Sequence, residues 1–189
     1  MDAVPSDAEI VADVLAGRTE RFALLVERHE DALFRHALSL GMDPDGAADM
    51  VQDAMVRAWE SLAECRDPTR FRLWVGRILR NRCLDHLKSA STRYTTSLDG
   101  ANDGAFEATG IPTPELDTQE RALHASLDEA LAALPDDQSE AFVLKHVEGY
   151  GYGEIAELTG ASVSALKMRV HRARDTIRAL LEADGFGPT

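Results

Sequence analysis

Apolar residues in the first ninety positions recur every three or four residues, which is the spacing of amphipathic helices. This pattern predicts four helices, at about 7–16, 20–40, 44–63 and 68–88. Their starts coincide with capping signals, namely Ser6 with Glu9, Thr19, Asp43-Pro44 and Asp67-Pro68. No segment of any length alternates apolar and polar residues as a half-buried strand does. Residues 1–90 are therefore predicted to form one all-helical domain.

A second helical segment follows a stretch of different composition. Residues 89–118 are rich in Ser, Thr, Gly, Asp and Pro and show no helical period. About thirty residues without structure are too many for an ordinary loop, so they predict a linker between domains. Helical patterns return near Thr118 and predict helices at about 118–134, 136–147, 154–159 and 162–183. The chain is thus expected to be all-α, with small helical domains at 1–90 and 119–185 and a flexible linker at 91–118.

The last two predicted helices are joined by a short turn that contains Gly160. Two helices connected in this way have the sequence form of a helix-turn-helix, whose second helix enters the DNA major groove. Along the second helix, the residues expected to face the core are Val163, Leu166, Val170, Ala173 and Ile177. The opposite face is polar and basic, as a DNA-reading surface would be. A solvated helix face with scattered arginines is the alternative interpretation.

Charge is distributed unevenly along the chain. The 189 residues include 20 Lys and Arg and 33 Asp and Glu, for a net charge of −13. Residues 66–93 nevertheless carry 8 basic and 2 acidic side chains, and residues 167–178 carry 5 and 1. Two basic stripes on an acidic body predict local DNA contacts together with acidic faces for a protein partner. They also predict weak non-specific DNA binding by the isolated chain.

Three segments resemble one family of transcription proteins. The segment LPDDQSEAFVLKHVEGYGYGEIAELTGASVSALKMRVHRAR, at 134–174, is similar to the −35-binding region of sigma factors of the sigma-70 family. DMVQDAMVRAW, at 49–59, resembles that family's core-polymerase-binding helix, and FRLWVGRILRNRCLDHLK, at 71–88, resembles its −10-recognition helix. Because both domains match in family order, the chain is identified as resembling the extracytoplasmic-function (ECF, group 4) sigma factors.

The resemblance implies three sets of functional residues. Contacts to core RNA polymerase, at the beta-prime clamp, fall to Asp49, Gln52, Asp53 and Arg57. Contacts to the −10 element fall to Arg66, Arg70, Arg77, Asn81 and Lys88. Contacts to the −35 element fall to Ser162, Ser164, Lys167, Met168, Arg169, His171, Arg172 and Arg174. The implied partners are core polymerase (clamp and beta flap), promoter DNA and an anti-sigma factor.

Other chemistries find little support in the sequence. Cys65 and Cys83 form no disulfide framework, and with His86 they fall short of a four-ligand zinc site, so small core residues are the simplest interpretation. No catalytic or phosphate-binding motif appears, so we expect no enzyme, no metal and no cofactor. The absence of a long apolar run predicts no membrane insertion, and the lack of a disulfide framework predicts a protein of the reducing cytoplasm. A stand-alone helix-turn-helix regulator and a protein that only sequesters polymerase remain the competing functions.

Overall fold

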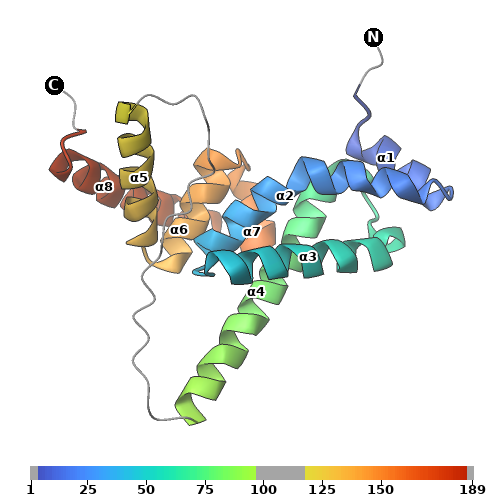
Figure 1. Cartoon of the computed structure of the whole chain (residues 1–189), viewed down its shortest axis with the longest axis horizontal. Helices are drawn as coiled ribbons and strands as arrows, with labels where there is room; N and C mark the ends of the chain where they lie inside the picture. The colour runs from blue at the N-terminus through green and yellow to red at the C-terminus, as the bar shows by residue number, and fades with distance from the viewer. Residues whose placement is uncertain (1–3, 97–117, 187–189) are drawn as a thin grey trace.

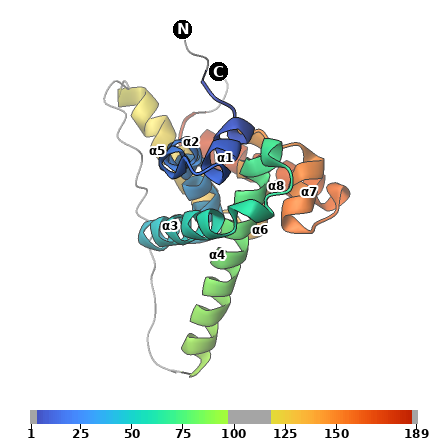
Figure 2. The ribbon, with the colours of Figure 1, turned by 90° about the vertical axis from the view of Figure 1, so that its right-hand side faces the viewer.

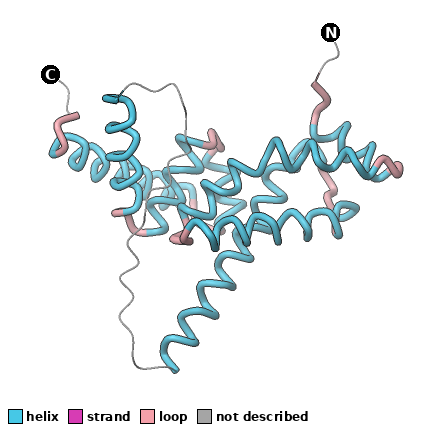
Figure 3. Tube along the Cα trace, in the orientation of Figure 1, coloured by secondary structure: helices cyan, strands magenta, loops and turns pink. Residues whose placement is uncertain are grey.

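The computed structural model describes residues 4–96 and 118–186, and all the regular elements within these ranges are helical (Figures 1 and 3). The first half contains α1 (Asp7–Leu15), α2 (Phe22–Ser39), α3 (Pro44–Glu60) and α4 (Phe71–Thr96). Short 3-10 turns precede or follow them at Thr19–Arg21, Leu62–Glu64 and Pro68–Arg70. The second half contains α5 (Thr118–Ala132), α6 (Asp136–Phe142), the π-helical turn η4 (Val143–Val147), α7 (Tyr152–Thr159) and α8 (Val163–Ala183).

Helices α1 to α4 enclose one hydrophobic core. Leu25 of α2 and Phe71, Val75 and Leu79 of α4 are fully buried in it. The last three are spaced by four residues, so they form a single stripe on the inner face of α4. The half-buried Trp74 packs against the same core. The apolar spacing that predicted a helix here thus corresponds to its buried face.

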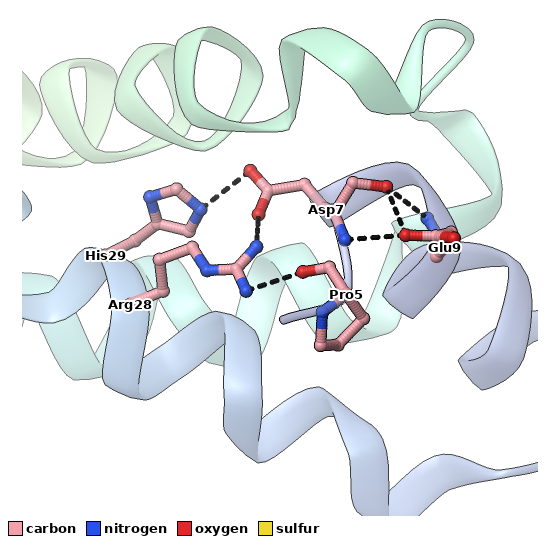
Figure 4. Close-up of polar contacts among 6 residues, drawn as sticks. Pro5, Asp7, Glu9, Arg28 and His29 are labelled. Carbon is pink, nitrogen blue, oxygen red and sulfur yellow. Dashed lines mark hydrogen bonds and ion pairs between the residues drawn. The ribbon is translucent and has the colours of Figure 1, made fainter. Parts of the chain in front are cut away.

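Polar contacts at the first turn of α1 hold this helix against the core (Figure 4). Ser6 and Glu9 form the predicted capping box. The Asp7 carboxylate contacts Arg28 of α2 and lies 2.8 Å from Nε2 of His29. His29 is buried, and burial lowers its pKa although the nearby Asp7 charge acts to raise it. The cap therefore fixes where α1 begins, and Asp7 fixes where it sits.

The second half packs around α8. Its C-terminal part buries Ala173 and Ile177 against Ala130 and Leu134, at the end of α5 and in the turn after it. Its N-terminal part buries Leu166 and Val170 against α6 and α7. The predicted four-helix arrangement of this half is thus present.

Three details of the prediction were wrong. Helix α4 continues to Thr96, eight residues beyond the expected end at Lys88, because no Gly or Pro interrupts it there. Its last turns therefore enter the stretch predicted as linker, whose remainder at 97–117 lies outside the described residues. Thr19 makes no helix-capping hydrogen bond and belongs to a 3-10 turn instead. Val163, predicted to face the core, is 40% exposed. The helix predicted at 136–147 is present, with its last five residues in the π-helical turn η4.

The two halves are packed against each other rather than held apart (Figures 1 and 2). Leu73 of α4 is only 5% exposed, and the core that buries it belongs to the second half, with Ile155 and Leu158 of α7. At Gly76, an added Cβ would meet Leu158 at 3.6 Å. Helix α4 thus contributes one face to the core of the first half and another to the contact with the second.

Candidate nucleic-acid interface

The turn between α7 and α8 has the geometry of a helix-turn-helix. Gly160 ends α7 in the left-handed region (φ 75°), a conformation that side chains with a Cβ rarely adopt. Ser162 then caps α8, because its Oγ accepts a hydrogen bond from the Ala165 N–H at 3.2 Å. Leu166 and Val170 are buried against Ile155 and Leu158 of α7, which fixes the angle between the two helices. The rest of the first turn of α8 points outward.

Most of the residues predicted to read the −35 element are exposed on α8 or at its cap. Exposed are Ser162, Ser164, Lys167, Met168, His171, Arg172 and Arg174. The apolar Met168 is 52% exposed on this face. Arg169 is half-buried, with its Nε 2.9 Å from the Asp137 carboxylate at the start of α6. The structure therefore presents one continuous polar face and holds Arg169 at its edge.

The residues predicted to read the −10 element all have exposed side chains, on α4 and just before it: Arg66, Arg70, Arg77, Asn81 and Lys88. Two of them already have partners in the second half. Arg70 Nη2 lies 2.8 Å from the Glu157 carboxylate of α7, and Arg77 donates to the Glu157 carbonyl at 3.3 Å. The α4 face is thus basic as expected but partly occupied.

The residues predicted to bind core polymerase lie on the outer side of α3. Asp49, Gln52 and Arg57 are exposed, whereas Asp53 is half-buried and pairs with Arg82 of α4. Gln52 also borders an apolar groove between α2 and α3, of about 580 Å³. Its walls include Phe22, Val26, Phe34, Val51, Met55, Val56 and Trp59, with Glu30 and Asp31 at the rim. The sequence analysis missed this groove, because apolar spacing does not show that Val56 and Trp59 stay exposed after folding.

A second set of residues that the sequence analysis missed lies between the two halves. Glu148, after η4, contacts Arg35 at 2.7 Å and Arg72 at 2.9 Å. Glu140 of α6 contacts Arg80 at 2.7 Å and His36 at 3.2 Å. Burial alone would raise the pKa of Glu140, but hydrogen bonds from His36 and Arg80 lower it. Arg72 and Arg80 belong to no recognised sequence motif. Between them, only the apolar Leu73 and the small Gly76 indicate that this face of α4 is buried.

The cysteines and histidines form no chemical centre in the described chain. Cys65 and Cys83 are buried free thiols. Burial raises the pKa of both, that of Cys83 to about 11, so neither is an activated nucleophile. Within 4–96 and 118–186, no three His, Cys, Asp or Glu side chains gather as metal ligands would. Nor does any described helix combine the length and the apolar character that crossing a bilayer requires.

Comparison with known families matches both halves of the chain. Residues 25–93 match the family model "Sigma-70 region 2", and residues 124–177 match "Sigma-70, region 4". The polar strip of α4 lies in the first match, and the helix-turn-helix lies in the second. Outside the two matches lie residues 1–24, which include α1 and the start of α2, residues 94–123, which include the start of α5, and residues 178–189.

Two relatives are similar to the chain over most of its length and of their own. The RNA polymerase sigma factor CnrH of Cupriavidus metallidurans is 35% identical over 189 residues, which cover 95% of this chain and 97% of the relative. The ECF RNA polymerase sigma factor SigM of Mycobacterium tuberculosis is 30% identical, covering 93% of this chain and 85% of that protein.

Two solved structures share the fold. The sigma factor RpoE of Bartonella quintana, in complex with the anti-sigma factor NepR, superposes with a TM-score of 0.72 at 28% identity. That match covers 86% of this chain and 98% of the other. CnrH, in complex with the cytosolic domain of CnrY, gives a TM-score of 0.64 at 30% identity and covers 95% and 99%. The chain therefore belongs to the extracytoplasmic-function sigma factors of the sigma-70 family.

Proposed function

We propose that this sigma factor directs initiation through three separate surfaces. Residues 1–90 act as region 2, in which α3 binds core RNA polymerase and α4 reads the −10 element. Residues 119–185 act as region 4, in which α8 reads the −35 element, and residues 91–118 connect them. The proposed −10 contacts are Arg66, Arg70, Arg77, Asn81 and Lys88, and the proposed polymerase contacts are Asp49, Gln52, Asp53 and Arg57.

The observation that carries this proposal is that α4 and α8 each bear a basic outer face opposite a buried apolar stripe. Neither face has enough cations to hold DNA tightly on a chain of net charge −13. Binding two promoter elements at once multiplies two weak affinities, provided that a scaffold fixes the spacing of the two domains. Core polymerase is that scaffold, so promoter binding depends on it.

On α8, residues in the first turns contact base edges and the flanking cations contact phosphates. The proposed contacts are Ser162, Ser164, Lys167, Met168, Arg169, His171, Arg172 and Arg174. Ser162 also leaves free N–H groups at the positive end of the α8 dipole, which favours a phosphate there.

Three further assignments rest on the family. We infer that the chain is a group 4 sigma factor, that it catalyses no reaction of its own, and that it works in the cytoplasm with core polymerase. An anti-sigma factor is the proposed regulatory partner, supported by the solved structures of RpoE with the anti-sigma factor NepR and of CnrH with the cytosolic domain of CnrY. The beta flap of polymerase is the proposed contact for region 4.

Reconstituted transcription tests the function. Core polymerase with this chain should initiate at defined sites on genomic fragments, and selection among random promoters should recover two conserved elements at fixed spacing. A stand-alone regulator would instead protect a palindromic site without polymerase. If core polymerase bound the chain and yet no template yielded transcripts, the chain would be a sequestering protein, and the proposal would be wrong.

A further inference from the structure

Met168 occupies the middle of the outer face of α8. The buried stripe of this helix consists of Leu166, Val170, Ala173 and Ile177. Successive residues of an α-helix are turned by about 100°, which places Met168 almost directly opposite the centre of that stripe. Its side chain is exposed and belongs to none of the hydrophobic clusters that the described residues form. Met168 therefore contributes to none of the cores against which α8 packs.

The neighbours of Met168 on this face are small or polar. Residues three or four positions apart are neighbours on a helix surface, so Ser164 and the small Ala165 lie one turn before Met168. His171 and Arg172 lie one turn after it. Ser164, His171 and Arg172 are exposed. A long apolar side chain thus stands among hydrogen-bonding and cationic groups.

The charge around this face indicates which kind of partner covers it. Residues 167–178 carry five basic side chains and one acidic side chain on a chain of net charge −13. DNA phosphates pair with such cations, and these contacts fix the register of a helix on the duplex without reading its sequence. An apolar protein surface would bury the same cations without partners, which is unfavourable. DNA is therefore the partner that fits both the charge and the exposed methionine.

Thymine is the base that offers a methyl group in the major groove. It presents this C5-methyl group beside its O4 acceptor, whereas the other three bases are distinguished there by hydrogen-bond donors and acceptors. A methionine side chain is unbranched and flexible, so it can adapt to the position of such a methyl group. A serine in its place could hydrogen-bond to more than one base and would discriminate less.

From this arrangement we propose that Met168 reads the C5-methyl group of a thymine and thereby sets a preference for an A·T pair at one position of the −35 element. The thymine can belong to either strand, since both base edges face the major groove. Ser164 and Arg172, one turn to either side, contact neighbouring base edges or phosphates. The proposal rests on the proposed function, because it takes α8 to be the −35 helix.

Replacement of thymine by uracil tests this contact, because uracil pairs with adenine in the same way and lacks only the methyl group. The −35 element is first obtained by promoter selection with holoenzyme, made of core polymerase and the full chain. Each thymine of the element, on both strands, is then replaced singly by deoxyuridine, and holoenzyme binding is measured by gel-shift titration. One replacement should weaken wild-type binding about fourfold, the effect of withdrawing one methyl group from an apolar contact.

Variants of the chain connect the methyl effect to Met168. Met168→Ala should bind the thymine and uracil templates equally at that position, whereas Met168→Leu keeps an apolar side chain and should retain most of the preference. Leu180→Ala removes another exposed apolar side chain, farther along α8, and should leave the thymine-to-uracil ratio unchanged. Because each ratio is taken within one variant, a general loss of affinity for polymerase cancels.

The inference would be overturned by a −35 element made of G·C pairs alone, or by a methyl effect that persists in Met168→Ala. Uracil replacements that all change binding by less than about twofold would overturn it as well. In each of these cases a −35 element is still recovered. If instead the proposed function is wrong, holoenzyme selects no −35 element and Arg172→Ala leaves promoter binding unchanged, and the inference is then wrong with it.

Discussion

Helices α4 and α8 are built alike but are used differently in the free chain. Each has an apolar stripe toward its own domain and a basic face on the other side. The basic face of α8 is exposed along its length, with Arg169 held at the edge by Asp137 and His171 paired with Asp175 of the same helix. That of α4 is partly covered by Glu157, Glu148 and Glu140 of region 4. A basic helix face therefore shows what a helix can bind, whereas its neighbours decide when it is free to bind.

The largest expected effect concerns the core face of α4. Phe71→Ala should lower the free energy of unfolding by about 3–5 kcal/mol, because Phe71 is fully buried in the region 2 core. Leu166→Ala is the matched change in region 4, with an expected loss of about 2–5 kcal/mol. Denaturant titration followed by circular dichroism measures both. A loss under about 1 kcal/mol at Phe71 would contradict its place in the core.

A base contact by α8 predicts the next effect. Arg172→Ala should weaken binding of holoenzyme to its promoter by about 1–3 kcal/mol if the guanidinium reads a base, and the loss should depend on the −35 sequence. Gel-shift titrations on promoter variants give the measurement. Arg178→Ala, farther along the helix, is the control for general loss of charge. Equal losses on all −35 sequences would assign Arg172 to phosphate instead.

As the pH falls, region 2 should lose stability before the interface between the two regions does. Burial lowers the pKa of His29, so the unfolded chain takes up the proton more readily, and stability should fall as the pH drops below about 6.5. One proton gives a slope of at most about 1.4 kcal/mol per pH unit. His29→Gln should flatten this part of the stability profile measured by denaturant titration. An unchanged slope in the variant would place the titration elsewhere.

The Glu140 carboxylate should respond in a lower pH range. Its pKa is lowered in the folded chain, so its contribution is complete above the ordinary value near 4.5 and is lost as the pH falls through the lowered one. X-ray scattering at decreasing pH should therefore show the two regions separating only after the loss of stability caused by His29 protonation has begun. Glu140→Gln serves as the control, because it has no carboxylate to protonate.

The smallest expected effect concerns the exposed ion pair at the edge of the interface between the two regions. Arg70 and Glu157 are 44% and 49% exposed, so their coupling should be about 0.2–1 kcal/mol. A double-mutant cycle with Arg70→Ala and Glu157→Ala measures it through unfolding of the free chain. Arg70→Ala should also weaken promoter binding, whereas Glu157→Ala should not. A coupling above about 2 kcal/mol would mean that this pair, and not the buried carboxylates, contributes most to the interface between the two regions.

Local signals were sufficient for most of the fold. The capping box at Ser6, the Asp43-Pro44 start and the Gly160 turn each act within a few residues, and the structure has all three. Periodicity identified the core face of α8, apart from Val163, because burial on one side of a helix repeats every three or four residues. The end of α4 was misjudged, since polar residues without Gly or Pro do not by themselves stop a helix.

The sequence by itself determined the two helical regions, their order and the basic faces of α4 and α8, because these depend on residues close together in the chain. Only the tertiary structure decided which faces are covered. The contacts of Glu148 with Arg72 and of Glu140 with Arg80 join residues 76 and 60 positions apart. No local period encodes such a pairing, since a carboxylate that neutralises an arginine is as polar in the sequence as one that faces water.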